Sequence, residues 1–182
     1  MYFFSNRIKK VSFCILGVAL AWVCLFKLNT LIFSYFEKTQ FVSWVFLPAG
    51  VRLLSVLIFE EYAVMGLFIG SLITSASMGN SIGQSLVISL ISALNPYFAV
   101  YTSKRLLGID KLLSQLNAKA LIVIALFSAS FNCLSHYLYF VFGPLNFTWE
   151  NCSTMFFGDL LGIFLILLFF NLSLQLIKKN SQ

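Results

Sequence analysis

The sequence predicts an all-α, multi-pass membrane protein, and three observations support this prediction. Of the 182 residues, 60% are hydrophobic and only 10% are charged, whereas soluble domains carry about 25% charged residues. The mean hydropathy is +0.93, and apolar runs recur along the whole chain. Several of these runs approach the roughly 20 apolar residues that a helix needs to cross a bilayer. The length therefore accommodates one transmembrane domain, residues 1–182, without a separate soluble module.

Six apolar segments, separated by polar or turn-forming residues, are the predicted spans. They comprise residues 11–27, 41–59, 62–77, 82–107, 120–142 and 153–177. The first segment also resembles a secretory signal peptide, with Ala19-Leu20-Ala21 as a cleavage-like site. We expect it to be a retained span, because the rest of the chain is equally apolar.

Basic residues flank alternate ends of these spans and predict the orientation of the chain. With the N-terminus inside, the cytoplasmic side receives Arg7, Lys9, Lys10, Lys104, Arg105, Lys111, Lys119, Lys178 and Lys179. The outer side receives only Lys27 and Lys38. Because basic residues favour the cytoplasmic side, we expect both ends inside a bacterial inner membrane. Trp22, Trp44 and Trp149 then fall near the outer surface, where an aromatic belt forms.

The second span contains Pro48, Ala49, Gly50 and Arg52 within five positions. Proline kinks a helix, glycine admits a close neighbour, and arginine in hydrocarbon normally faces a partner or a cavity. Asp159 lies early in the sixth span, at a depth that an extended arginine reaches if each residue rises 1.5 Å. We expect these residues to face inward and Arg52 to pair with Asp159. The pair is either a structural lock or a ligand site or switch, unless Arg52 snorkels to the surface instead.

The fourth and fifth spans contribute further polar candidates. His136 is the only histidine, and Asn132 lies four residues earlier on the same helix face. This face is either a polar packing stripe or part of an outward-facing pocket. Asn95-Pro96 is predicted to break the fourth span, either to line a cavity or as a packing kink. The candidate ligand-binding or switch residues are therefore Arg52, Asp159, His136, Asn132 and Asn95.

No catalytic or metal-binding pattern is present in the sequence. Hydrolase, zinc-protease, phosphate-loop and dinucleotide-binding motifs are all missing. Cys14, Cys24 and Cys133 lie in predicted spans and Cys152 in a predicted loop, without metal-ligand spacing, so we interpret them as small apolar residues. We expect no enzymatic activity, no cofactor and no metal. The net charge of +6 is explained by the flanks of the spans, and we expect no nucleic-acid partner.

Three segments in order resemble the bacterial membrane-associated sensor domains of the first MASE class. They are Leu47-Pro48-Ala49-Gly50, Gly66-Leu67-Phe68-Ile69-Gly70-Ser71 and Phe157-Gly158-Asp159-Leu160-Leu161-Gly162. The structural motif residues are Pro48, Ala49, Gly50, Gly66, Gly70, Gly158 and Gly162, to which Pro96 is added from the fourth span. The resemblance covers about residues 44–170. It implies a sensory input domain, usually joined to a histidine kinase or a cyclic-dinucleotide enzyme.

This chain differs from that family in two respects. We expect no output domain after Lys179, and the proline expected after the Gly-Asp motif is missing from the sequence. We therefore expect a sensory or ligand-binding membrane protein that acts through a partner membrane or signalling protein, with a small-molecule ligand as a possible input. The alternatives are a substrate-capture transport subunit, which six spans with both ends inside would also fit, and a structural component of a membrane complex.

Overall fold

The computed structural model describes residues 2–39, 41–110, 116–143 and 147–180 and is predominantly helical, as the sequence predicts. A short two-stranded antiparallel hairpin is the only sheet in this part of the chain. The elements in order are α1 (Tyr2–Phe33), η1 (Ser34–Phe36), β1 (Glu37–Thr39), β2 (Val42–Ser43), α2 (Pro48–Phe59), α3 (Glu61–Ser77), α4 (Ile82–Leu107), α5 (Ala118–Val141) and α6 (Trp149–Asn180).

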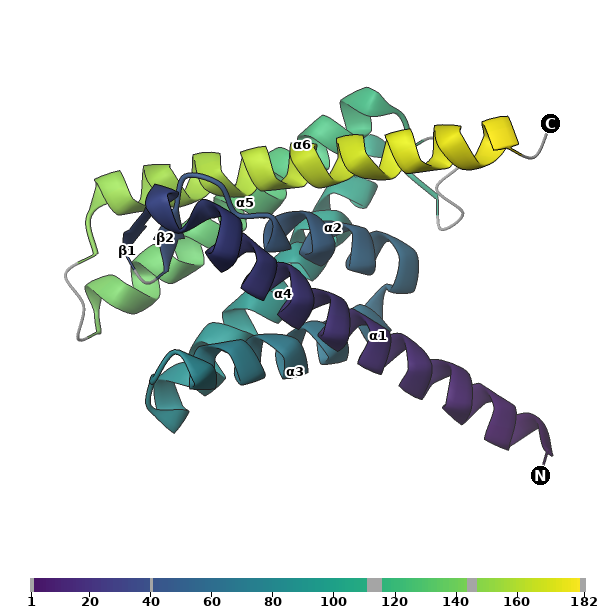
Figure 1. Ribbon diagram of the computed structural model, residues 1–182, viewed down its shortest axis with the longest axis horizontal. Helices are drawn as coiled ribbons and strands as arrows, with labels where there is room; N and C mark the ends of the chain where they lie inside the picture. Colours follow the sequence, from purple (N-terminus) through teal and green to yellow (C-terminus); the bar gives the residue numbers. More distant parts are fainter. Residues whose placement is uncertain (1, 40, 111–115, 144–146, 181–182) are drawn as a thin grey trace.

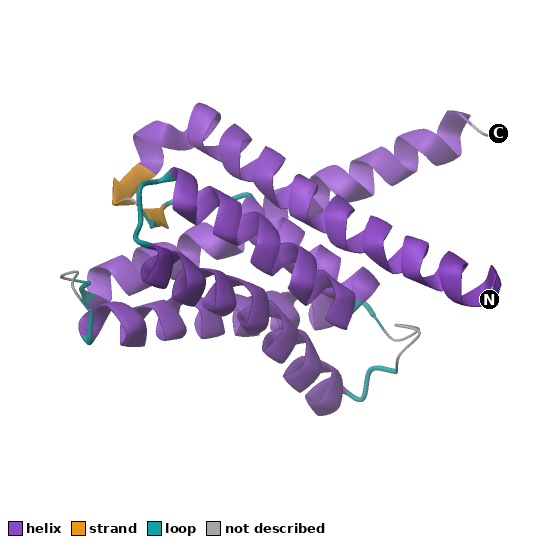
Figure 2. Cartoon of the chain, turned by 90° about the horizontal axis from the view of Figure 1, so that it is seen from below, coloured by secondary structure: helices purple, strands orange, loops and turns teal. Residues whose placement is uncertain are grey.

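Successive helices run in alternating directions through one bundle (Figures 1 and 2). The two ends of the chain therefore lie at one end of the bundle, which we call the terminal end, together with the α2–α3 connection. The β1–β2 hairpin and the α3–α4 turn lie at the opposite end, which we call the hairpin end. Within the bundle, α3 packs against both α1 and α4, and α5 packs against α4 and α6.

Four of these helices, namely α1, α4, α5 and α6, are long and apolar enough to cross a membrane. The other two are shorter, with 12 residues in α2 and 17 in α3. At 1.5 Å per residue these two helices extend about 18 and 25 Å, less than the roughly 30 Å of a hydrocarbon core. Helices of membrane-spanning length thus account for most of the bundle, and two shorter helices pack among them.

The distribution of polar residues is typical of a membrane protein. Large apolar side chains such as Phe13, Leu31 and Phe169 are exposed on the outer helix surfaces. Ionisable residues within a membrane normally face the protein interior, and here Arg52 and Asp159 are almost completely buried. Further buried polar residues are Asn29, Ser55, Ser71, Thr74, Ser75, Ser85, Ser89, Ser92, Asn95, Ser103, Ser128, Asn132, His136, Asn151 and Thr154.

The predicted span over residues 41–59 is wrong in its first part, because its helix begins only at Pro48. Proline suits the first position of a helix, where its missing N–H is not needed and its fixed φ angle is already helical. Residues 41–47 contain the short strand β2 and are otherwise irregular. We call this whole segment, residues 41–47, the strap. From Pro48 onward the prediction of an inward-facing segment is confirmed, since Pro48, Ala49, Gly50 and Arg52 are all buried.

The strap is partly buried, and other elements satisfy its backbone. The Trp44 N–H donates to the Phe36 carbonyl at 3.0 Å, and the Phe46 N–H donates to the Gly158 carbonyl at 3.1 Å. The Leu47 N–H donates to the side-chain oxygen of Asn29 at 2.8 Å. Irregular backbone that is shielded from water is tolerated when protein groups supply its hydrogen bonds in this way.

The helix α4 runs without interruption through Pro96, so the predicted break is wrong. Proline removes one backbone hydrogen bond, but packing against neighbouring helices maintains the remainder of a membrane helix. Pro96 is fully buried. The preceding Asn95 accepts a hydrogen bond from the Ser135 hydroxyl of α5 at 3.1 Å. The pair is therefore a packing joint between α4 and α5.

Two further boundaries differ from the sequence prediction. The helix α1 continues to Phe33, well beyond the predicted end of the first span at residue 27. Cys152, predicted in a loop, lies in the first turns of α6. Together with Cys133 it packs in an apolar cluster around Phe140, in agreement with a role as a small apolar residue.

Glycines in α3 bring this helix into direct contact with α1. A β-carbon at Gly66 would lie 2.7 Å from the Ile15 carbonyl oxygen, and one at Gly70 would lie 2.9 Å from the Ala19 carbonyl oxygen. Small residues spaced by four allow such close backbone approach in membrane helices. The first helix is thereby an integral part of the bundle.

Candidate functional site

Three buried side chains from three helices form a closed polar ring in the bundle. The Arg52 guanidinium of α2 donates one hydrogen bond to Asp159 of α6 at 2.8 Å and another to the side-chain oxygen of Asn132 of α5 at 2.7 Å. The Asn132 amide donates to the second Asp159 oxygen at 2.7 Å. The expected Arg52–Asp159 pair is present, and Asn132 completes the ring.

The ring neutralises two charges that would be costly alone at this depth. Arg52 and Asp159 have exposed fractions of 2% and 1%, so neither side chain reaches the surface by snorkelling. A buried pair offsets the cost of desolvation only when additional hydrogen bonds satisfy its remaining donors and acceptors. Asn132 supplies both kinds, since its oxygen accepts from Arg52 while its NH₂ group donates to Asp159.

Local sequence brings the three residues together. Arg52 lies in the first turns of α2, which the strap orients. Asp159 lies between Gly158 and Gly162, where α6 crosses the strap so closely that a β-carbon on either glycine would overlap a backbone carbonyl, of Ser43 and of Phe46 respectively. These glycines therefore determine how closely α6 packs against the strap. The position of the Asp159 carboxylate depends on this packing distance.

Aromatic rings cover the Arg52 guanidinium on the side of α1 and the strap. Its central carbon lies 5.8 Å from the centre of the Trp22 ring and 5.5 Å from that of Phe46, within the range of cation–π attraction. The Arg52 Nε–H has no hydrogen-bond partner within the described chain. The Trp22 indole N–H donates to the Thr74 hydroxyl at 3.0 Å.

The expected place of Trp22 in an interfacial aromatic belt is wrong, because its side chain is 3% exposed and packs in the interior. Trp44 and Trp149 do lie on the surface, with exposed fractions of 47% and 63%.

His136 adjoins the ring one helical turn after Asn132. Its Nδ1 lies 2.9 Å from the backbone carbonyl oxygen of Asn132. A carbonyl oxygen only accepts, so Nδ1 carries the proton, and Nε2 is the acceptor in the neutral ring. The histidine side chain also packs against Phe140, with ring centres 5.9 Å apart.

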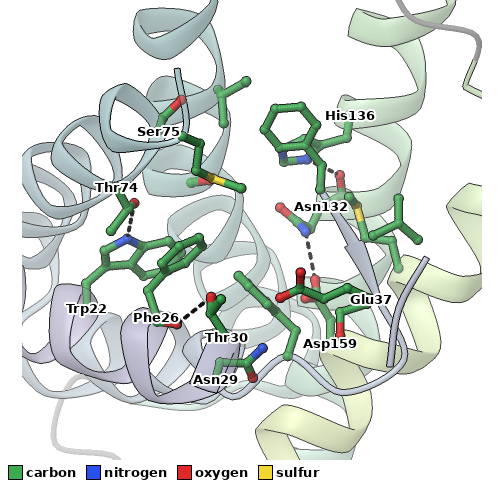
Figure 3. Close-up of a pocket in the computed structure, with 18 of the residues that line it drawn as sticks. Trp22, Phe26, Asn29, Thr30, Glu37, Thr74, Ser75, Asn132, His136 and Asp159 are labelled. Atoms are coloured by element: carbon green, nitrogen blue, oxygen red, sulfur yellow. Dashed lines mark hydrogen bonds between the residues drawn. The ribbon is translucent and has the colours of Figure 1, made fainter. Parts of the chain in front are cut away.

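A pocket of about 180 Å³ extends from the ring to the surface at the hairpin end. In Figure 3, Trp22 and Thr74 lie on one side of this pocket, and Asn132, His136 and Asp159 lie on the other. The walls come from every helix and from the hairpin. The lining residues are Trp22, Phe26, Lys27, Asn29, Thr30, Glu37, Thr39, Phe41, Val42, Ser43, Phe46, Arg52, Thr74, Ser75, Ser77, Met78, Ile88, Ser92, Asn132, His136, Met155 and Asp159.

The mouth of the pocket is formed by exposed residues, among them Lys27, Glu37 and Thr39. Partial burial raises the pKa of the Glu37 carboxyl above its usual value. On the hairpin itself, Lys38 forms an ion pair with Glu150 of α6 at 2.5 Å. This ion pair connects the hairpin to α6 at the hairpin end.

Four of the five candidate residues lie together at this site, namely Arg52, Asp159, Asn132 and His136. Asn95 does not line the pocket, because its side chain points to Ser135.

The sequence analysis did not predict the α1 wall of the pocket. It ended the first span at residue 27, with a loop to residue 40 in which part of residues 31–36 could extend the helix, whereas Asn29 and Thr30 are helical and line the pocket. One signal is present in the sequence: Trp22, Phe26, Asn29 and Thr30 follow a helical spacing of four, seven and eight.

Comparison of the chain with protein families, with curated proteins and with solved structures gives no match.

Proposed function

We propose that this chain is a sensory, ligand-binding protein of a bacterial inner membrane that recognises a small molecule in the hairpin-end pocket. The observation that carries the proposal is the continuity of the pocket from exposed residues at its mouth to the buried Arg52–Asn132–Asp159 ring at its floor. A concave, mostly apolar cavity with a few convergent polar groups is the usual form of a ligand site.

The size and the lining of the pocket define the ligand class. An apolar cavity of roughly 150 Å³ accepts benzene, so a cavity of about 180 Å³ suits a molecule of one ring. Aromatic side chains of Trp22, Phe26 and Phe46 form apolar walls, and Nε2 of His136 is an acceptor. The ligand is therefore a small, flat molecule that donates at least one hydrogen bond.

The hydrogen-bonded Arg52–Asn132–Asp159 ring at the floor of the pocket transmits ligand binding to the helices. It joins α2, α5 and α6, so a ligand that displaces one partner changes the packing of three helices at once. A ligand shifts such an equilibrium only by its differential affinity for the two arrangements. The change then passes to a partner protein, in accordance with the resemblance to membrane-associated sensor domains.

A transport subunit is the second candidate, because a pocket open at one end also suits substrate capture. The hydrogen-bonded ring closes the floor, which favours binding without passage. Cross-linking in native membranes followed by mass spectrometry distinguishes the two candidates. A kinase or cyclic-dinucleotide enzyme as the partner supports sensing, whereas a transporter ATPase supports transport.

The first test of the pocket is to fill it. We expect Ser92→Leu, which adds volume at a lining position on α4, to abolish thermal stabilisation by neutral one-ring compounds that stabilise the wild type in detergent. The control is Ser130→Leu, an equal change at a half-buried position on α5 that does not line the pocket. If neither protein responds to any such compound, or if Ser92→Leu responds like the wild type, the assigned ligand site is wrong.

The orientation has a separate test. We propose six spans with both termini in the cytoplasm, because the terminal end carries Lys104, Arg105 and Lys119 as well as the basic residues near both termini. Alkaline phosphatase should be inactive when fused after Gln182 and active when fused after Gly143, and a fluorescent protein that folds only in the cytoplasm should show the reverse. An active phosphatase at Gln182 would contradict this topology.

A further inference from the structure

A second cavity, of about 450 Å³, lies at the terminal end, opposite the ligand pocket. It is formed where α2 ends, α3 begins and α4 makes its last turns. Its lining residues are Val56, Glu60, Glu61, Tyr97, Val100, Tyr101, Lys104, Arg105, Gly108 and Ile109. None of these residues belongs to the site described above.

The lining carries both signs of charge, and one group of each sign has no ionic partner within the described residues. Lys104 and Glu60 form an ion pair at 3.2 Å. Arg105 and Glu61 form no ion pair in the described part of the chain, and both side chains are exposed. The cavity thus presents one unpaired cation and one unpaired anion to a molecule that enters it.

An aromatic ladder on α4 accompanies these charges. The Arg105 guanidinium lies 4.7 Å from the centre of the Tyr101 ring, and Tyr101 stacks on Tyr97 with ring centres 6.4 Å apart and an interplanar angle of 12°. Stacking on an aromatic face holds a guanidinium in place while leaving its N–H edge free to bind an anion.

The α2–α3 connection holds Glu60 in an unusual conformation beside the cavity. Its φ angle is +49°, in the region that favours glycine. A non-glycine residue there is held by its surroundings and is frequent at ligand sites. Glu60 and Glu61 line the cavity together with Lys104 and Arg105.

Apolar groups beside the cavity face outward, as lipid-facing groups do. Phe98 is 50% exposed and Leu106 is 66% exposed, and both lie on α4 next to lining residues. This part of α4 is the end of a helix that is apolar enough to span a membrane. In a bilayer crossed by this helix, the cavity would lie where headgroups meet hydrocarbon, with apolar helix surface beside it for acyl chains.

We propose that this cavity binds the headgroup of a phospholipid that contains both a phosphate and a primary ammonium, as phosphatidylethanolamine does. Arg105 and Lys104 bind the phosphate, because a guanidinium matches phosphate oxygens with two parallel N–H groups. Glu61 accepts charge-assisted hydrogen bonds from the ammonium. The proposal requires that the chain span a membrane and is independent of the ligand pocket.

The experiment measures lipid binding to the full chain after delipidation in detergent. Native mass spectrometry is used to titrate phosphatidylethanolamine, phosphatidylcholine and phosphatidylglycerol with identical acyl chains, and free phosphoethanolamine in parallel. We expect phosphatidylethanolamine to bind about tenfold more tightly than phosphatidylcholine, whose quaternary ammonium donates no N–H bond to Glu61, since a hydrogen bond to a charged group contributes about this factor.

Two variants test which side chains bind the ammonium and the phosphate of the headgroup. Glu61→Gln should reduce the affinity for phosphatidylethanolamine to that for phosphatidylcholine, whereas Arg105→Gln should weaken the binding of all three lipids. Their controls are Glu150→Gln and Lys119→Gln, which make the same charge changes outside the cavity. All four positions are exposed, so circular dichroism should show folded protein throughout.

Three results would overturn the proposal. Equal affinities for the three lipids would show annular contact without a site. Tighter binding of phosphatidylglycerol would show a purely anionic site. Binding of free phosphoethanolamine without preference among the lipids would show a site for a soluble ligand.

Discussion

Replacing Arg52 by alanine should lower the free energy of unfolding by about 3–5 kcal/mol, the cost of breaking a buried ion pair in soluble proteins. Among the described residues, the substitution leaves the Asp159 carboxylate, which is 1% exposed, with the Asn132 amide as its one remaining side-chain partner. It also removes the cation from between the Trp22 and Phe46 rings. Asp159→Ala should cost a similar amount, because it leaves the guanidinium buried and unpaired. Unfolding by SDS from mild detergent micelles measures both.

The double variant tests whether the two side chains act together. The double variant Arg52→Ala/Asp159→Ala should lose much less unfolding free energy than the two single variants lose together. Neighbouring residues in one network show coupling energies of about 0.5–3 kcal/mol. Strict additivity would contradict the ring. Asn132→Leu offers a further comparison, since it removes both of its ring hydrogen bonds at similar volume without removing a charge.

The same variants separate a structural role from a signalling role. If the ring transmits occupancy, the double variant folds but loses the response to ligand. If the ring only locks the helices, the double variant regains both stability and response. The unfolding free energy of each variant is measured alongside its response to ligand. A variant that has lost its fold is thereby distinguished from one that has lost only its function.

Among the glycine-to-alanine changes, Gly162→Ala should be the most damaging. Its β-carbon would overlap the Phe46 carbonyl oxygen, and backbone cannot rotate away as a side chain can. Overpacking of this kind typically costs about 1–3 kcal/mol and occasionally more. We expect α6 to move away from the strap, which lengthens the hydrogen bond from the Phe46 N–H to Gly158 and displaces Asp159. The unfolding free energy and the ligand-dependent stabilisation should therefore fall together.

Gly17→Ala is the matched control for this prediction. Gly17 also lies within a long helix, α1, but a β-carbon there meets nothing within 4 Å. Alanine has the higher helix propensity by about 1 kcal/mol in peptides, so this variant should be as stable as the wild type or slightly more stable. Equal losses at positions 17 and 162 would show that close packing against the strap is not the cause.

The sequence by itself determined the helices that carry local boundary signals. The predicted limits of α4, residues 82–107, agree with the structure. Ser81 and Gln84 exchange hydrogen bonds in a capping box at its start, and Gly108 adopts a left-handed conformation at its end. Such signals act within a few residues. The inward-facing position of Arg52 was equally predictable, because a charge at membrane depth requires a partner.

Only the tertiary structure decided which partners meet. The strap appears as a helix in the sequence because residues 41–47 are apolar, and its irregular form is stable only because Phe36, Asn29 and Gly158 bind its backbone N–H groups. Asn29 and Phe36 precede the strap closely in the sequence, whereas Gly158 comes from α6, which is distant in the sequence and is brought to the strap only by the fold.

The same reason explains the composition of the site. Asn95 and Asn132 are equivalent candidates by residue type, yet one bonds to Ser135 and the other completes the Arg52–Asp159 ring. The hydrophobic pattern of the sequence predicts that a helix forms. The rotation of that helix about its axis depends on close contacts such as those of Gly158 and Gly162 with the strap. That rotation determines which polar group faces the pocket.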